Sequence, residues 1–418
     1  MKKTLLLVIA AFLAIPGFAQ TVLRQDGLIY KLYTPQEGAP YAEVSGNLLT
    51  ESTDVVIPEK VTKSDVDYPV TAIANEAFKG CEYLTSIILP STLLRIDSKS
   101  FYGCTNLDNI VIPSNVSEIS QRAFQSCNKL SSISLPKSLT AISDYTFYKC
   151  QRLKHVDIPE SVLTIGNNSF YGCKALESID IPDSVISIGN SSFYGCGLNT
   201  VIFGNSVKTI GTDAFTGCND LVSVILGNSL ETIGYTSFSN CLSLKELDIP
   251  ESVTLIDDYA FFNCTSLKSV SIKESAITID NAAFYGCTSL ESITIPHGVV
   301  SIGSLAFAEC VNLADITYLT TDPIAAKKDI FDESIYKTAT LTVAKDGLDK
   351  AYETEPWMYF VNIKEADTSG IDFIETDSNE DVEVYNLSGV KVGESTDGLA
   401  KGIYIMRNGN STSKIVIR

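Results

Sequence analysis

The sequence predicts a mainly β solenoid with short helical turns, built from eleven coils of about 23 residues. The first observation that predicts it is a Phe-x-x-Cys phrase, which recurs eleven times at one fixed step, with a single shorter step between Phe193 and Phe215. A fixed period of this size is typical of stacked repeats. The phenylalanines are Phe78, Phe101, Phe124, Phe147, Phe170, Phe193, Phe215, Phe238, Phe261, Phe284 and Phe307, each followed in the same phrase by a cysteine.

The second observation is a set of aliphatic columns in register with this phrase. After the cysteine come a leucine, then two aliphatic residues separated by a polar one, and commonly a proline, as in Leu107, Ile110, Ile112 and Pro113. Alternation with a period of two is typical of a short strand, and proline ends it because it cannot donate to the ladder. An unbroken column of isoleucine, from Ile73 to Ile302, predicts a second short extended segment in each coil.

The third observation concerns the turn around each phenylalanine. A small residue (Ala, Ser or Thr) precedes every one of them, which predicts a tight turn of helical type where neighbouring coils approach closely. Glycine precedes the cysteine in six of the eleven coils and asparagine in two, which favours a positive φ angle at that position.

All eleven cysteines, from Cys81 to Cys310, occupy one column of the repeat. Equivalent residues of stacked coils lie about 4.8 Å apart, and parallel side chains at that spacing hold their Cβ atoms farther apart than a disulfide prefers. We therefore predict buried free thiols that act as small apolar side chains. One or two disulfide bridges are the alternative.

The recurring columns, Leu-x-x-Ile-x-Ile-Pro followed by Ser-Val-x-x-Ile-Gly-x-x-Ala-Phe-x-x-Cys, resemble those of the BspA-type leucine-rich repeat family. The resemblance covers residues 71–318, more than half of the chain. It implies a leucine-rich-repeat-like solenoid without the asparagine ladder of ordinary leucine-rich repeats. Members of that family are bacterial surface or secreted proteins and several are regarded as adhesins, so the resemblance implies a binding role.

The pattern divides the chain into six parts. We expect a signal peptide at 1–19, an N-terminal cap at 20–70 that begins with a β-hairpin, the solenoid at 71–318, a C-terminal cap at 319–366, a linker at 367–381 and a β module at 382–418. Trp357, the only tryptophan, is expected to plug the last coil. The apolar run of the signal is short for a transmembrane span, and no later stretch approaches that length.

The tail, residues 382–418, resembles the C-terminal sorting domain that type IX secretion machinery recognises. That resemblance implies secretion or anchoring machinery as a partner and an extracellular or outer-surface location. A small β module with another attachment role is the alternative.

Charge limits the partners. Without the two lysines of the signal peptide, the chain has a net charge of (31 − 2) − 50 = −21. Because phosphate binding depends on lysine and arginine contacts, nucleic acid and anionic membranes are not expected partners.

The sequence contains no recognisable catalytic, cofactor or metal motif. The two histidines, His155 and His297, fall in coils that are far apart along the stack, and there is no phosphate-binding loop or nucleophile elbow. Asp157 and Asp180 would lie on adjacent coils and could mimic a glycosidase pair, although a solvated strand face explains them better. We therefore expect no enzyme activity, no cofactor and no metal.

Two surfaces are candidate binding sites. The outward positions of the first strand in each coil include His155, Asp157, Asp180, Glu246 and Asp248. The position after phenylalanine carries an aromatic row, Tyr102, Tyr148, Tyr171, Tyr194, Phe262 and Tyr285. The row could stack on a sugar or a protein, or its members could pack on one another.

The function predicted from these observations is that of a secreted or cell-surface, adhesin-like binding protein without enzyme activity. Its ligand would be a protein or a glycan, host molecules included. A structural spacer of the outer surface is the alternative, and a glycan-active enzyme is a more distant one.

Overall fold

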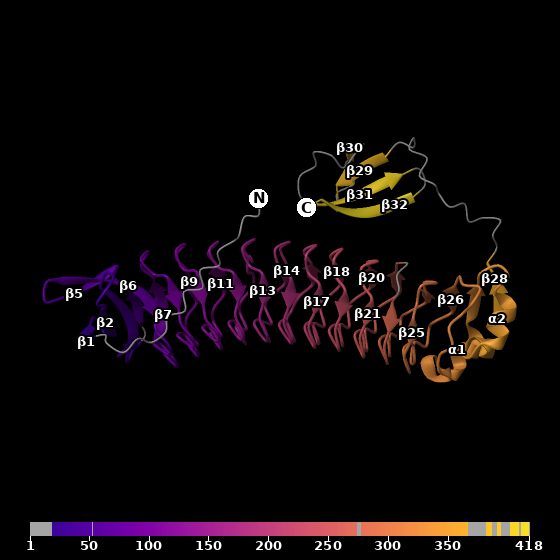
Figure 1. Cartoon of the computed structure of the whole chain (residues 1–418), viewed down its shortest axis with the longest axis horizontal. Helices are drawn as coiled ribbons and strands as arrows, with labels where there is room; N and C mark the ends of the chain where they lie inside the picture. The colour runs from indigo at the N-terminus through magenta and orange to yellow at the C-terminus, as the bar shows by residue number, and fades with distance from the viewer. Residues whose placement is uncertain are drawn as a thin grey trace. The chain divides into compact units, whose positions relative to one another are not determined.

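The computed structural model of the chain describes residues 19–51, 53–273, 277–366, 382–386, 391–393, 402–408 and 411–417. The predicted linker and most of the predicted signal peptide lie outside these residues. The chain divides into two compact units, Met1–Ala366 and Asp367–Arg418. Figure 1 shows the first unit as a stack of coils, with the N-terminal strands at one end and the short helices at the other.

The N-terminal strands close the first end of the stack. Strands β1 (Ala19–Gln25), β2 (Leu28–Thr34) and β3 (Tyr41–Asn47) pair antiparallel in chain order, which includes the predicted hairpin. Strand β3 then pairs in parallel with β6 (Val66–Ile73), whose other partner in this region is the antiparallel β5 (Lys60–Lys63). The alternating residues Leu28, Tyr30 and Leu32 of β2 are buried, so this sheet covers the apolar end of the solenoid.

Most coils contribute a first strand near the leucine position of the repeat. These strands pair in parallel within three separate sheets, and the coil without a first strand is joined to its neighbour by an isolated bridge between Ser132 and His155. The first strands are β4 (Thr53–Val56), β7 (Leu84–Ile88), β9 (Asn109–Val111), β11 (Ser132–Ser134), β14 (Ser178–Asp180), β16 (Thr200–Ile202), β18 (Ser223–Ile225), β20 (Glu246–Ile249), β22 (Ser269–Ile272), β24 (Ser292–Thr294) and β26 (Asp315–Tyr318).

A second, two-residue strand in each coil ends on the isoleucine column. The alternation of one exposed or half-buried residue with the buried isoleucine fits this short extended segment. The second strands are β8 (Arg95–Ile96), β10 (Glu118–Ile119), β12 (Ala141–Ile142), β13 (Thr164–Ile165), β15 (Ser187–Ile188), β17 (Thr209–Ile210), β19 (Thr232–Ile233), β21 (Leu255–Ile256), β23 (Thr278–Ile279) and β25 (Ser301–Ile302).

Phenylalanine rings form the axis of the core. All eleven predicted phenylalanines are fully buried, and neighbouring rings stack with centroids 5.0 to 5.8 Å apart. Phe331 extends this column by one ring beyond Phe307, at 5.5 Å. The solenoid has about 13 turns of about 23 residues, slightly more than predicted, because flanking strands pair in register with the repeats.

The cysteine column is buried and every thiol is free, as predicted. The thiols also donate hydrogen bonds, which the sequence did not predict. From Cys104 onward, each Sγ donates to the carbonyl oxygen of the phenylalanine one coil earlier, at 3.1 to 3.4 Å. Cys81, in the first coil, instead donates to Oδ1 of Asn47 in the N-terminal cap, at 3.6 Å.

The turn around each phenylalanine is tight, but it is a series of turns rather than a helix. The residue two positions before the phenylalanine has a positive φ in all eleven coils, although none is glycine, as at Glu76, Lys99 and Leu305. The residue before the cysteine also has a positive φ in all eleven coils. A helix requires negative φ, so these two positions stop a helix from forming. The expected positive φ is therefore confirmed at the residue before cysteine. The sequence did not predict the positive φ two positions before phenylalanine.

Short runs of Asp and Asn side chains, which the sequence analysis did not predict, link neighbouring coils at the turns. Three residues before phenylalanine, Asp and Asn side chains accept backbone hydrogen bonds from the next coil. The backbone N–H of Asn167 donates to Asp144 at 2.7 Å, and that of Asn190 donates to Asn167 at 2.8 Å. A second run joins Asp258, Asn281 and Ser304 at 2.8 and 2.9 Å. Because each run spans only a few coils, it left no continuous column in the sequence.

The other end of the stack is closed by a mixed cap. Strands β27 (Thr340–Val343) and β28 (Asn362–Glu365) continue the parallel ladder from β26. The short helices η1 (Lys328–Ile330) and α1 (Glu333–Thr338) precede β27 in the chain. The short helices α2 (Leu348–Glu353) and η2 (Trp357–Tyr359) lie between β27 and β28. Trp357 is fully buried and its Nε1 donates to the Ile324 carbonyl oxygen at 2.8 Å, so it closes the core as predicted.

The second unit contains a four-stranded antiparallel sheet in the order β30-β29-β31-β32. Its strands are β29 (Val382–Asn386), β30 (Lys391–Gly393), β31 (Gly402–Asn408) and β32 (Ser411–Ile417). They fall within the predicted β module.

Candidate binding surface

The aromatic row follows the turns of the solenoid, directly after the buried phenylalanines. Tyr148, Tyr171 and Tyr194 stack on one another with centroids 4.9 and 4.7 Å apart and nearly parallel rings. Phe262 and Tyr285 form a second stacked pair at 5.2 Å. These side chains, and that of Tyr102, are half-buried. All members except Tyr102 therefore stack on a neighbour in the row, one of the alternatives that the sequence left open, and the stacked rings present their edges outward.

The first part of the row carries cations on its ring faces. The Arg122 guanidinium lies 4.6 Å from the Tyr145 ring centroid, and the Lys149 ammonium lies 5.3 Å from that of Tyr148. Tyr145 in turn packs against Tyr148 at 5.6 Å. These contacts hold the outer rings of the row by cation–π attraction. The sequence did not point to Arg122, Tyr145 and Lys149, because they stand outside the column that defines the row.

Burial, followed by the neighbouring hydroxyls of Tyr194 and Tyr148, raises the pKa of Tyr171. The phenol therefore stays neutral at physiological pH. Within the described residues, the hydroxyls of Tyr148, Tyr171 and Tyr194 have no hydrogen-bond partner and are not buried. The row thus offers hydroxyl donors and acceptors at regular spacing to a molecule outside the chain.

The second part of the row has a different setting. Tyr235 and Tyr259 make an edge contact at 6.0 Å, and Tyr259 makes another with Phe262 at 5.7 Å. Between the two parts, Asp213 accepts hydrogen bonds from Thr216 at 3.1 Å and Thr236 at 2.6 Å. The row is therefore two separate aromatic clusters rather than one continuous ladder.

The second candidate surface lies on the first strands, away from the row. His155 Nε2 is 2.7 Å from Asp157 Oδ1, and both side chains are largely exposed, at 63% and 92%. Asp180 is exposed at the end of β14, and Glu246 and Asp248 are exposed on β20. Ile202 and Ile225 occupy the equivalent position on the coils between Asp180 and Asp248, so the acids form two separate groups.

An acidic group of a different kind lies on the turns. Carboxylate oxygens of Asp257, Asp258 and Asp280 lie within 4.8 Å of one another. Burial, followed by the charges of Asp258 and Asp257, raises the pKa of Asp280. Asp258 already accepts two hydrogen bonds from Asn281, so at least part of this group links neighbouring coils.

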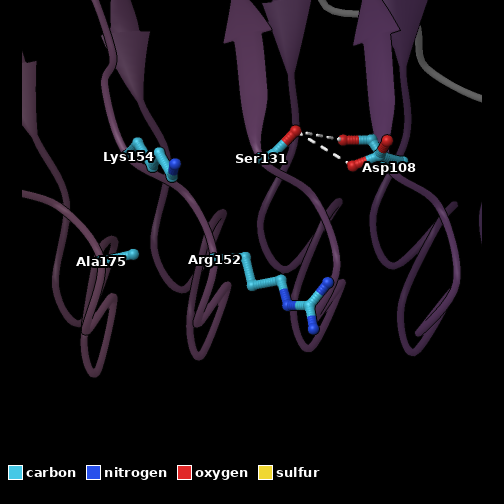
Figure 2. Close-up of a pocket in the computed structure, with 5 residues that line it drawn as sticks. All are labelled: Asp108, Ser131, Arg152, Lys154 and Ala175. Atoms are coloured by element: carbon cyan, nitrogen blue, oxygen red, sulfur yellow. Dashed lines mark hydrogen bonds between the residues drawn. The ribbon is translucent and has the colours of Figure 1, made fainter.

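A shallow hollow crosses several neighbouring coils of the solenoid. Its volume is about 360 Å³, and it is lined by Asp108, Ser131, Arg152, Lys154 and Ala175. Figure 2 shows Asp108 and Ser131 joined by hydrogen bonds, with Arg152 extending toward the coil that carries Ser131. The sequence identified none of these residues as a site.

Parallel coils with columns of leucine and isoleucine around a phenylalanine axis define a leucine-rich repeat solenoid. The chain belongs to the BspA-type leucine-rich repeat region family, whose model matches residues 71–199, 140–268, 187–314 and 255–342. This result confirms the resemblance seen in the sequence. Within the described residues, no helix is both long and apolar enough to cross a membrane.

Several solved structures are similar to this chain. A leucine-rich repeat protein from Bacteroides ovatus is 23% identical over 85% of this chain and 100% of its own, with a TM-score of 0.44. The T. pallidum leucine-rich repeat protein is 29% identical over 54% of this chain and 91% of its own, with a TM-score of 0.38. The pneumococcal vaccine antigen PcpA is 21% identical over 83% and 99%, with a TM-score of 0.41. No curated protein matches the chain.

Proposed function

We propose that this chain is an exported, non-enzymatic binding protein of the bacterial surface that presents its solenoid to a protein or glycan ligand. The observation that carries the proposal is the stacked row of Tyr148, Tyr171 and Tyr194. Their ring spacing of 4.7 to 4.9 Å is fixed by the coils beneath, and their hydroxyls have no partner within the described residues. A rigid, amphipathic aromatic row of this kind is typical of recognition surfaces, because little side-chain entropy is lost on binding.

The chain's chemistry supports binding rather than catalysis. The His155–Asp157 pair is largely exposed to solvent on an open strand surface, with side chains 63% and 92% exposed, so it does not line a cleft that could hold a substrate. The acids Asp157 and Asp180 lie on an open strand surface, whereas glycosidase carboxylates flank a bound sugar in a cleft.

Binding of the labelled full chain to extracellular matrix proteins and mucin tests the proposal. We expect saturable binding to at least one of them. An absence of binding at concentrations on the order of tens of micromolar, where even weak contacts register, would favour the spacer role instead. Turnover of any member of a polysaccharide panel would overturn the non-enzymatic assignment.

The tail is proposed to direct the protein to its location. The resemblance of residues 382–418 to a sorting domain supports this role, with the secretion or anchoring machinery as the partner. Deletion of residues 382–418 should lower the surface-exposed fraction of the protein in its native cell, measured by protease accessibility of intact cells. An unchanged surface fraction would remove the sorting role while leaving the binding role of the solenoid intact.

A further inference from the structure

An exposed basic cluster lies within this acidic chain. Between residues 122 and 174 there are seven lysines and arginines and three acids, a net charge of 7 − 3 = +4, whereas the whole chain carries −19. Lys129, Arg152, Lys154 and Lys174 form the exposed core of this region, which we name the basic cluster. Such a local reversal of charge steers oppositely charged ligands to one place on a protein.

The cations of the basic cluster have no acid partners. None of the four forms an ion pair within the described residues. In the first coils, by contrast, Lys79 and Lys99 both pair with Glu76, at 2.9 and 3.2 Å. The cluster is therefore free to bind an external anion.

The arrangement of the cluster places like charges side by side. Lys129 and Arg152 each stand two positions after the cysteine, in successive coils. These two residues lie in turns rather than in strands, and like charges at one position of neighbouring coils repel each other unless something neutralises them. A bound polyanion would do so.

The basic cluster borders both the hollow and the aromatic row. Arg152 and Lys154 line the hollow. Asp108 is the acidic residue in the same lining, and its Oδ1 accepts a hydrogen bond from Ser131 Oγ at 3.0 Å. Lys149, on the same turn as Arg152, lies over the Tyr148 ring. The Nε of Arg122, at the end of the row, is buried without a hydrogen-bond partner among the described groups. Lys149 therefore connects the turn that carries Arg152 with the first tyrosine of the row.

We propose that the basic cluster and the tyrosines beside it bind a linear anionic polysaccharide that runs along the stack of coils. This proposal rests on the proposed binding function and names its ligand class. The cations would pair with carboxylate or sulfate groups through charge-assisted hydrogen bonds. The ring faces of Tyr148, Tyr171 and Tyr194 are occupied by one another, so the ligand meets ring edges and hydroxyl groups. A hydroxyl-rich, negatively charged chain satisfies both kinds of group.

The test compares ligands of matched backbone and different charge. Affinities of the full chain are measured by calorimetry for polygalacturonate, dextran sulfate and unsubstituted dextran, with polyglutamate and single-stranded DNA as other polyanions. We expect polygalacturonate or dextran sulfate to bind and dextran not to bind. The affinity should fall steeply as salt rises, because exposed charges are screened.

Two charge-reversal variants locate the site. Arg152→Glu/Lys154→Glu should weaken binding of the anionic polysaccharide by about tenfold or more, because both cations lose their attraction for the ligand. Lys245→Glu/Lys268→Glu is the matched control, since both lysines are exposed at the position of Lys154 in other coils, away from the cluster. It should change the affinity by less than about threefold, the part that comes from net charge alone.

Three results would overturn the proposal. These are equal losses in both variants, which would indicate non-specific charge attraction; binding of only polyglutamate or DNA; and binding of none of the polyanions. If the last result accompanied retained binding to mucin or a matrix protein, this inference would fail while the proposed function stood. If no ligand of either kind bound, both would fail.

Discussion

At the scale of single residues, the cysteine column couples stability to pH. Burial raises the pKa of Cys150, Cys264 and Cys310 to about 12, and it raises that of most other thiols in the column. The folded protein therefore keeps protons that the unfolded chain, with thiol pKa values of about 8.5, releases. The contribution of these thiols to the free energy of unfolding is therefore fully present below the unfolded pKa, and it is lost as the pH rises through the folded pKa.

Replacing one buried thiol should make stability less sensitive to alkaline pH. Between about pH 9 and 11, Cys264→Ser should reduce the slope of unfolding free energy against pH by roughly 1 kcal/mol per pH unit, because serine does not titrate there. The measurement is urea unfolding at several pH values. The control is Ser237→Ala, which removes a buried hydroxyl and should keep the wild-type slope. Identical slopes for Cys264→Ser and the wild type would contradict the account of the column.

Residue-level features differ in how far the sequence predicts them. The burial of Phe261 or Cys264 follows from a column that recurs in every coil. The basic cluster does not follow from a recurring column, and the net charge of the chain hides it, because that charge sums Lys129 and Arg152 with acidic residues far along the chain. The left-handed residues before phenylalanine, such as Lys99 and Ala282, also give no signal, because backbone hydrogen bonds to the next coil rather than glycine impose their conformation.

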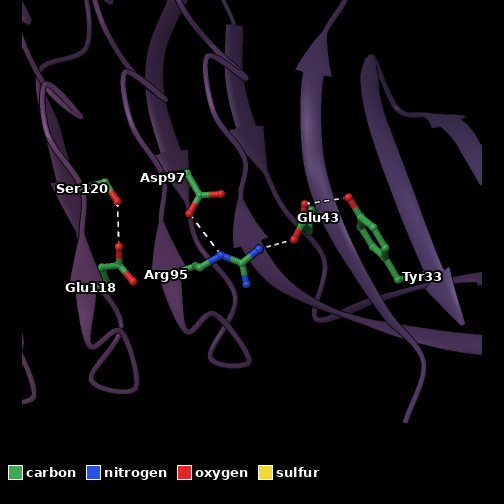
Figure 3. A network of polar contacts seen from close by, with 6 residues as sticks. All are labelled: Tyr33, Glu43, Arg95, Asp97, Glu118 and Ser120. Atoms are coloured by element: carbon green, nitrogen blue, oxygen red, sulfur yellow. Dashed lines mark hydrogen bonds and ion pairs between the residues drawn. The ribbon is translucent and has the colours of Figure 1, made fainter. Parts of the chain in front are cut away.

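At the scale of elements, a polar network fastens the N-terminal cap to the solenoid. Arg95 on β8 pairs with Glu43 on β3, and its Nε donates to Asp97 Oδ1 at 3.1 Å. Tyr33 on β2 donates to the other Glu43 oxygen at 3.2 Å (Figure 3). Residue 72 on the intervening strand β6 is alanine, which leaves room for Arg95 to reach across it.

Breaking this network should loosen the cap. Arg95→Met leaves Glu43 buried without its cation, and the expected loss is about 2 to 3 kcal/mol of unfolding free energy, somewhat below the loss for a fully buried pair. The reason for the lower value is that 32% of the Arg95 side chain is exposed, against 10% for Glu43.

An exposed ion pair of the same cap supplies the control. Lys60 and Asp67 join β5 to β6 with side chains 58% and 49% exposed. Lys60→Met should cost less than about 1 kcal/mol. Urea unfolding of both variants checks the comparison, and equal losses would mean that the Glu43–Arg95 pair does not fasten the cap.

The short coil shows how an element absorbs an irregularity. Gly197 follows Cys196 in the one shortened step of the repeat, and a Cβ there would lie 2.2 Å from the Lys174 carbonyl oxygen. Glycine therefore allows this turn to be one residue shorter, and Leu198 remains fully buried. The missing residue was visible in the sequence, but the close backbone approach was not.

At the scale of the whole molecule, stability accumulates between neighbouring coils, since each coil pairs only with the coils before and after it. Removal of residues 228–250 joins Gly227 to Glu251 in register and deletes one complete coil. This variant should fold cooperatively with a melting temperature only slightly below that of the full chain. Buried Trp357 reports on it, because its fluorescence should remain native-like.

The control deletion removes residues 228–239, which is half a coil. It shifts every following column out of register and should destabilise the stack severely, seen as a red-shifted Trp357 emission. If both deletions behaved alike, the nearest-neighbour description of the solenoid would be wrong.

The architecture was predictable at this scale because a single phrase fixes the period, the strands and the core. The residues of the candidate site were predictable in part. Tyr148, Tyr171 and Tyr194 stood out as a column, but their cationic neighbours did not, because they occupy other positions in only a few coils. Features shared by all coils are visible in one sequence, whereas features that vary between coils need coordinates.

The most direct test of the central claim is the affinity of a row variant for whichever matrix protein, mucin or polysaccharide the full chain binds. Tyr171→Thr/Tyr194→Thr suits this test, because Thr216 and Ser239 show that small polar residues fit the same position. Tyr352→Thr, at an exposed tyrosine outside the row, is the control. We predict about a tenfold or greater loss of affinity for the row variant, with an unchanged melting temperature, and no loss for the control. Equal affinities of the row variant and the full chain would contradict the claim that this row is the binding surface.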